Sequence, residues 1–159
     1  MKQHIIALIM ALGLSACTTA PHQSTNSSSE QQVTSNASPA MDRPMYLRGD
    51  FTLWDADEVY RLTQTQTGLY SVRVRFMSPG KLYEFKIADA KWTPGYNCGF
   101  RYDGKVSLGK PVVADCDTVY NYFGFMPDRK GWYRISLDLR GAVPQIIVQR
   151  DCRVGWFYC

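Results

Sequence analysis

The chain has 159 residues, with 18 Lys and Arg against 14 Asp and Glu, and a formal net charge of +4. The basic residues are scattered rather than gathered in a run, which argues against nucleic acid as a partner. The two histidines are His4 and His22. The remaining chain therefore lacks the commonest general base and the commonest transition-metal ligand. This excludes a Ser-His-Asp or Cys-His catalytic site there, and we predict no cofactor and no metal.

The first sixteen residues have the pattern of a secretory signal peptide. Lys2 provides a basic start, an apolar run extends from Ile5 to Leu14, and Ser15-Ala16 precede Cys17. The apolar run is too short to span a membrane. Residues 14–17 resemble a bacterial lipobox, which implies cleavage before Cys17 and its acylation. Thr18 stands where inner-membrane lipoproteins usually carry Asp, so the resemblance implies an anchor in the outer membrane, on either face. The alternative is an ordinary signal peptide with an incidental cysteine.

Residues 17–40 are predicted to be a flexible tether. They consist mainly of Ser, Thr, Gln, Asn, Pro and Ala. Such a segment buries too little apolar surface to offset the entropy of ordering. We expect one folded domain over 41–150, followed by a short tail over 151–159.

The folded part shows the alternation of half-buried β-strands. Tyr70, Val72, Val74 and Phe76 alternate with polar residues, and similar patterns recur near 83–87 and 133–139. Turn signals separate these runs, and no segment has a sustained helical period. The sequence therefore predicts an all-β sandwich of about seven or eight strands. We expect the strands near 44–49, 58–63, 69–76, 82–88, 105–113, 118–125, 132–139 and 144–150. A helical turn at 56–58 is the alternative to the second strand.

Four further cysteines fall in this region: Cys98, Cys116, Cys152 and Cys159. An even number in an exported domain indicates two disulfides, and four cysteines allow three pairings. Proximity in sequence favours Cys98–Cys116 and Cys152–Cys159. The second pair would close a loop with three aromatic residues, which would be either a stapled flap over one end of the fold or a contact surface.

Several spaced motifs then resemble a family. These are Tyr46-Leu-Arg-Gly-Asp-Phe-Thr-Leu-Trp54, Tyr83-Glu-Phe-Lys-Ile-Ala-Asp89 with Trp92, and Gly131-Trp-Tyr-Arg-Ile-Ser-Leu-Asp138. Together they look like the immunoglobulin-like starch- and glycogen-binding modules attached to bacterial pullulanases. The resemblance covers about residues 44–149 and implies an immunoglobulin-like β-sandwich. One departure is Phe51-Thr52-Leu53-Trp54, where the family usually has Phe-Asn-x-Trp.

The resemblance implies that Trp54, Lys86 and Trp92 contact α-glucan. Flat CH faces of sugar rings pack on indole rings, and a lysine donates hydrogen bonds to hydroxyls. We expect Asn97, in a nearby loop, to add a polar contact. The alternatives are a core tryptophan at Trp54 or Trp92, and an ordinary exposed strand lysine at Lys86, on the same solvated sheet face as Arg73, Arg75 and Lys81.

Two functions follow as hypotheses. The first is a lipid-anchored module that binds starch, glycogen or maltodextrin without cleaving it. The second is an envelope interaction or assembly lipoprotein that uses the same sandwich to bind a protein partner. Paired carboxylates can hydrolyse glycosides, and Asp55, Asp57, Glu58 and Asp89 fall near the expected loops. About 119 residues leave little room for a deep cleft, so we expect a protein that is not an enzyme.

Overall fold

The structure is a computed structural model that describes residues 41–102 and 104–152. The expected signal peptide, Cys17 and the tether lie outside these residues, as does Cys159 in the tail. Within the described ranges, no helix has the length and apolar character needed to cross a membrane.

Ten strands and two short 3-10 turns make up the described chain. The 3-10 turns are η1 (Asp50–Thr52) and η2 (Glu58–Tyr60). The strands are β1 (Tyr46–Gly49), β2 (Thr63–Gln66), β3 (Leu69–Phe76), β4 (Tyr83–Ala88), β5 (Asn97–Phe100), β6 (Lys105–Val106), β7 (Val112–Asp115), β8 (Phe123–Phe125), β9 (Gly131–Asp138) and β10 (Gln145–Arg150).

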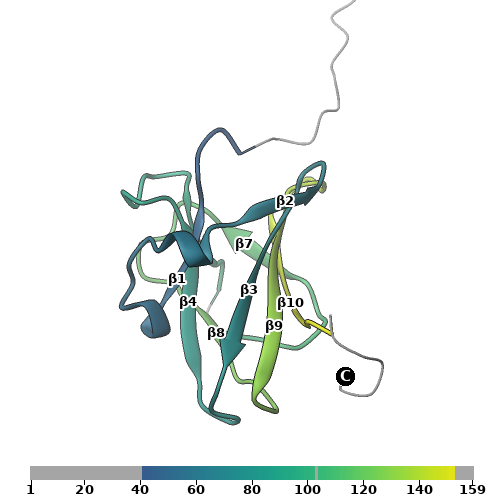
Figure 1. The fold of residues 1–159 in the computed structure, drawn as a ribbon. Coiled ribbons are helices and arrows are strands. Elements are labelled where there is room, and N and C mark those ends of the chain that lie inside the picture. The colour runs from purple at the N-terminus through teal and green to yellow at the C-terminus, as the bar shows by residue number, and fades with distance from the viewer. Residues whose placement is uncertain (1–40, 103, 153–159) are drawn as a thin grey trace, which may run out of the picture. The chain divides into compact units, whose positions relative to one another are not determined.

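The strands form two layers that are joined along one edge. In the first layer, β4 pairs with β1 on one side and with β5 and β8 on the other, and β6 pairs with β8. In the second layer the order is β2-β3-β9-β10-β7. A short β5–β7 pairing connects the two layers. Figure 1 shows β1 and β4 on one side of the molecule and β3, β9 and β10 on the other. The all-β prediction is confirmed, with ten strands in place of seven or eight.

Aromatic side chains fill the space between the layers. The ring centroids of Phe76 on β3 and Tyr83 on β4 are 4.5 Å apart, and those of Phe125 on β8 and Tyr133 on β9 are 5.3 Å apart. Full burial of such a side chain contributes about 1.5–3 kcal/mol. Alternation along β3, β4 and β9 places these residues inward, as the sequence predicts.

Three of the predicted strand ranges are wrong in detail, and one observed strand has no predicted counterpart. Residues 58–60 form η2, because the Asp57 side chain accepts a hydrogen bond from the Val59 amide and caps the turn. The strand at 97–100 has no predicted counterpart, because Asn-Cys-Gly-Phe shows no alternation of β-branched or aromatic residues with polar ones. The range 105–113 is interrupted after Val106, and the range 118–125 contains strand only from Phe123.

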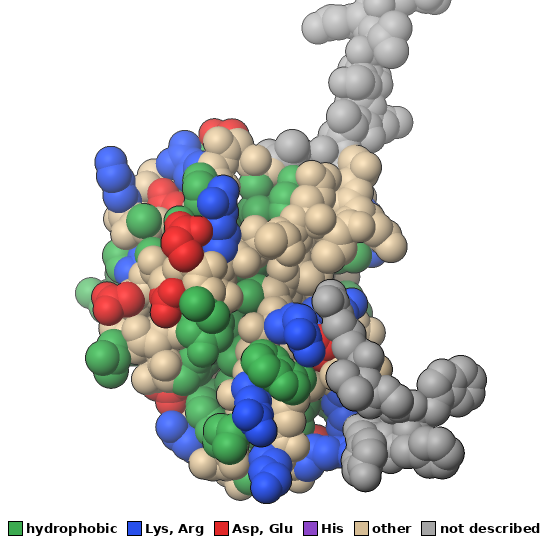
Figure 2. Space-filling view, viewed as in Figure 1, with side chains coloured by type: hydrophobic (Ala, Val, Ile, Leu, Met, Phe, Trp, Pro, Cys, Tyr) green, Lys and Arg blue, Asp and Glu red, His purple; other side chains and the backbone are tan. Residues whose placement is uncertain are grey.

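The expectation of a solvated basic face is correct in part. Arg75 and Lys81 are exposed and Arg73 is half-buried. Figure 2 shows basic side chains gathered over the lower part of the β3–β9 layer, beside exposed hydrophobic ones. Lys86, in contrast, is only 1% exposed. It points away from the core, but the chain between Cys116 and Phe123 covers it.

Candidate aromatic binding site

A pocket of about 330 Å³ lies on the outer side of the β1–β4–β5 layer. Three loops and two strands contribute to it. The lining residues are Trp54, Lys86, Trp92, Asn97, Val119, Tyr120 and Tyr122. The structure therefore brings together all four residues that the sequence analysis selected, although they span more than forty positions of the chain.

Trp54 reaches the pocket from a tight turn after β1. Leu53 and Trp54 both have left-handed backbones, with φ of 52° and 65°. This conformation is rare for bulky residues, costs on the order of 1–3 kcal/mol, and persists only where the surroundings enforce it. The Trp54 amide donates to Gly49 O at 2.9 Å, and Thr52 Oγ1 accepts from the Gly49 amide at 2.9 Å. Thr52 thus provides the side-chain oxygen that orders the turn, where the resembled family has an asparagine.

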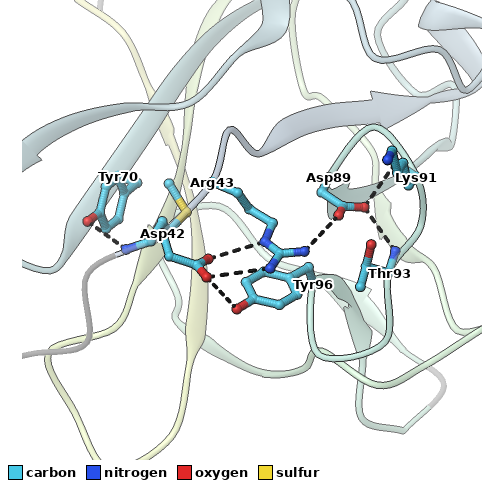
Figure 3. Close-up of polar contacts among 8 residues, drawn as sticks. Asp42, Arg43, Tyr70, Asp89, Lys91, Thr93 and Tyr96 are labelled. Atoms are coloured by element: carbon cyan, nitrogen blue, oxygen red, sulfur yellow. Dashed lines mark hydrogen bonds and ion pairs between the residues drawn. The ribbon is translucent and has the colours of Figure 1, made fainter.

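Trp92 lies in the loop between β4 and β5, which is built around the buried carboxylate of Asp89. One carboxylate oxygen accepts from the amides of Lys91 and Thr93, at 3.0 and 2.9 Å. Figure 3 shows Asp89 inside this loop, with Arg43 between it and Asp42. Burial alone would raise the pKa of Asp89, but the hydrogen bonds from Thr93 and Lys91 outweigh it and lower the pKa below its ordinary value. The carboxylate serves to hold the loop.

The aromatic rings of the pocket converge without being coplanar. The ring centroids of Trp54 and Trp92 are 6.4 Å apart, with an interplanar angle of 45°. Those of Trp54 and Tyr122 are 4.8 Å apart at 49°. Trp54 and Trp92 are both half-buried, and neither belongs to the core cluster. The interpretation of these residues as core tryptophans is therefore wrong, and the three rings form a bent surface.

Beneath the tryptophans lies Arg48, which the sequence analysis did not select. Its guanidinium carbon is 3.6 Å from the centroid of the Trp92 ring. Its Nε donates to Trp54 O and its NH1 to Asp89 O, both at 2.7 Å. One buried cation, 5% exposed, therefore joins both tryptophan loops. Burial lowers the pKa of this guanidinium, while Asp55 and Asp89 act in the opposite direction.

Lys86 is the strand partner of Arg48, and both side chains lie on the outer face of the layer. Lys86 Nζ donates to Thr118 O at 2.6 Å and to Thr118 Oγ1 at 2.8 Å, and lies 3.4 Å from Val119 O. Burial lowers the pKa of the ammonium to about 8, and Asp115 acts against this shift. The alternative, that Lys86 is an ordinary exposed strand lysine, is wrong, because the 117–122 loop covers it.

That loop forms the third wall of the pocket and carries Tyr120 and Tyr122. The predicted disulfide Cys98–Cys116 ties its first end to β5. A Cβ atom on Gly99 would lie 1.7 Å from Asn121 O, so the loop packs directly on this glycine. Cys152 is also disulfide-bonded, and Cys159, its predicted partner, lies outside the described residues.

Asn97 provides an unused polar atom at the pocket. It begins β5 rather than lying in a loop, and it is 7% exposed. Its Oδ1 is buried and has no hydrogen-bond partner. An unsatisfied buried acceptor costs about 1–3 kcal/mol. This oxygen is enclosed by protein atoms, so a ligand that donates a hydrogen bond would reach it only after the Asn97 side chain turns toward the pocket.

Three of the four acidic residues named in the sequence analysis have structural partners. Asp57 caps η2, and Glu58 accepts from the Tyr46 hydroxyl at 2.7 Å. Asp89 holds the Trp92 loop, as described above. Among residues 41–102 and 104–152, no group of three His, Cys, Asp or Glu side chains is placed to bind a metal ion.

Sequence reasoning missed four residues of the site: Arg48 beneath the tryptophans, and Val119, Tyr120 and Tyr122 in the pocket wall. Arg48 had one usable signal, since it alternates with the buried Leu47 and therefore shares a face with Lys86 once β1 is paired with β4. The loop residues had none, because the range 118–125 reads as a strand.

No protein-family model and no curated protein sequence matches the chain. A solved structure, the ligand-induced structure of the starch-binding domain AmyP-SBD, is similar to it, with a TM-score of 0.53 and 19% sequence identity. The similarity covers 86% of this chain and 96% of that chain. It shows that the two chains share a fold.

Proposed function

We propose that this protein is a non-catalytic carbohydrate-binding module that holds an α-glucan in the pocket of Trp54, Trp92 and Tyr122. The observation that carries this proposal is the convergence of the three rings in one pocket that Asn97 also lines. The volume of the pocket, about 330 Å³, is at the small end of the range for ligand pockets. The fold shared with a starch-binding domain supports the expectation of carbohydrate binding, although a fold alone does not determine function.

The chemistry of a neutral sugar fits these groups. A pyranose ring presents a CH face to an indole and hydroxyl groups at its edge. Trp54 and Trp92 would pack against successive rings, and the Asn97 amide, once turned toward the pocket, would accept from a hydroxyl. Because the two indoles are inclined by 45°, they suit a glucan that curves from one ring to the next. A flat β-1,4-linked chain would need faces closer to coplanar.

The experiment is isothermal titration of the purified protein with β-cyclodextrin, maltoheptaose and cellohexaose. We expect heat from the two α-linked ligands and none from cellohexaose. In Trp54→Ala the α-glucan signal should disappear while the thermal unfolding transition remains. A folded protein that binds none of the α-linked ligands would contradict the proposal. It would leave the second hypothesis, a protein-binding envelope lipoprotein, as the better one.

We also propose that the module is attached to the outer membrane through lipid on Cys17. The support is the sequence pattern of residues 1–17 alone, and these residues lie outside the described ones. Mass spectrometry of the protein from membranes tests it, since the N-terminal peptide should begin at an acylated Cys17. Cys17→Ser should release the protein from the membrane fraction.

A further inference from the structure

The ammonium of Lys86 is fully engaged by the protein itself. A lysine ammonium has three N–H donors and no acceptor. Three oxygens surround Lys86 Nζ within 3.4 Å, namely Thr118 O, Thr118 Oγ1 and Val119 O. In this geometry no donor is left for a sugar hydroxyl. Lys86 therefore differs from Asn97, which lines the same pocket with an unused acceptor.

The contacts of Lys86 all fall on one short segment, Thr118–Tyr122. This segment contributes Val119, Tyr120 and Tyr122 to the pocket. Tyr120 is 79% exposed, and the ring of Tyr122 packs at 4.8 Å on Trp54. The disulfide at Cys116 fixes the start of the loop, and β8 begins at Phe123. Between these points, the charge-assisted bonds from Lys86 link the loop to the middle of β4.

We propose that Lys86 is a positioning residue whose proton orders the Thr118–Tyr122 wall, so that affinity for α-glucan is lost when Lys86 becomes neutral. This inference rests on the proposed function and adds regulation by pH to the same pocket. A neutral amine keeps two N–H donors for three acceptors. One bond is then lost, and the other two lose the strength that the charge gives them.

The surroundings of Lys86 make this change accessible. Arg48 faces it from β1, Asp115 attracts it from β7, and the Tyr122 ring centroid lies 5.9 Å from its Nζ. Burial lowers the pKa of Lys86 to about 8. The proton is therefore lost between pH 7 and 9, well below the ordinary pKa of about 10.4 for an exposed lysine.

The first test is made without ligand. The Val119 methyl groups in ¹³C-labelled protein should shift or broaden between pH 7 and 9, with a midpoint near 8. Lys86→Met should show, at both pH values, the shifted or broadened Val119 signals that the wild type shows at pH 9. Lys86→Arg, which keeps its charge, should show at both pH values the Val119 signals that the wild type shows at pH 7. Lys110→Met is the matched control, since this exposed turn lysine carries the same substitution, and it should titrate as the wild type does.

The second test is the affinity for β-cyclodextrin over the same pH range. We expect binding about tenfold weaker at pH 9 than at pH 7, the size expected for one lost charge-assisted hydrogen bond. Lys86→Met should bind weakly at both pH values, and Lys86→Arg should show no pH dependence. Wild-type methyl signals that do not change from pH 7 to 9 would overturn the inference, as would undiminished binding in Lys86→Met. If β-cyclodextrin binds at no pH, the proposed function fails, and the methyl titration still decides the role of Lys86.

Discussion

Two regions of the molecule present tryptophan to the surface, and they differ in construction. Trp132 is 45% exposed on the outer face of β9, directly opposite Arg75 of β3, with Arg73 stacked on it at 4.7 Å. It belongs to a regular eight-residue strand. Trp54 and Trp92 are less exposed, and both have left-handed backbones outside the strands.

The difference shows that exposure of an aromatic ring is a poor guide to a binding site. On the β3–β9 face, Arg73 and Arg134 both pair with Asp151, so one carboxylate holds two of the arginines near Trp132. In the pocket, two buried cations bond to backbone carbonyls and hold three loops, while Asn97 keeps an unused acceptor. Strain and unsatisfied polarity together distinguish the pocket, and such features gather at functional sites.

The largest expected difference between the regions comes from removing one ring from each. Trp92→Ala should weaken α-glucan binding by about 2–3 kcal/mol, the loss typical of an aromatic hot spot. Trp132→Ala should leave the affinity unchanged, because Trp132 lies on β9 and does not line the pocket. Titration calorimetry of both variants, with their unfolding curves, tests this. Equal losses of affinity would mean that the two regions bind together, and the distinction drawn above would fail.

A second difference concerns how closely the backbone packs. Gly99→Ala would place a Cβ 1.7 Å from Asn121 O, a backbone atom that cannot yield without moving the 117–122 loop. We expect about 1–3 kcal/mol lower stability, and weaker α-glucan binding because Tyr122 moves. Gly124→Ala is the control, since its Cβ would meet the flexible end of Leu82 at 3.1 Å. Denaturant unfolding and titration should separate the two variants. Equal behaviour would contradict the tight contact at Gly99.

Much of this architecture could be predicted from residues alone, for reasons specific to each part. The long strands β3, β4 and β9 follow from strict alternation. Cys98–Cys116 follows from proximity, since the two residues lie 18 apart. Trp54, Lys86 and Trp92 were selected by resemblance, and Asn97 only as a neighbour in an expected loop.

The environment of these residues could not be predicted from the sequence. Lys86 looks like any polar residue on a half-exposed strand until the 117–122 loop is known to cover it. That loop contains Val119, Tyr120 and Tyr122, whose high β propensity indicates a strand. The close packing on Gly99 and the Cys98–Cys116 disulfide hold it as a loop instead. Arg48 is likewise defined by its partner strand, which local sequence does not specify.

Asn97 should respond in opposite directions when stability and binding are compared. Asn97→Leu removes a buried acceptor that has no partner, so unfolding of the free protein should be unchanged or up to about 1 kcal/mol more costly. The affinity for β-cyclodextrin should fall about tenfold, because the sugar loses its acceptor. Thermal unfolding with and without ligand measures both effects. Loss of stability in the free protein would indicate that Oδ1 already has a partner, and would remove Asn97 from the binding argument.

The smallest effect tests the backbone itself. Leu53 is exposed and has a φ of 52°, next to the equally left-handed Trp54. Leu53→Gly should stabilise the protein by about 0.5–1 kcal/mol, since glycine adopts this conformation without the steric cost, partly offset by its larger chain entropy. Arg75→Gly, on the extended strand opposite Trp132, should lower stability by a similar amount. Opposite signs in denaturant unfolding would confirm that the pocket carries the strain and the β3–β9 face does not. A destabilising Leu53→Gly would instead mean that the Trp54 turn is relaxed, and that its unusual backbone says nothing about binding.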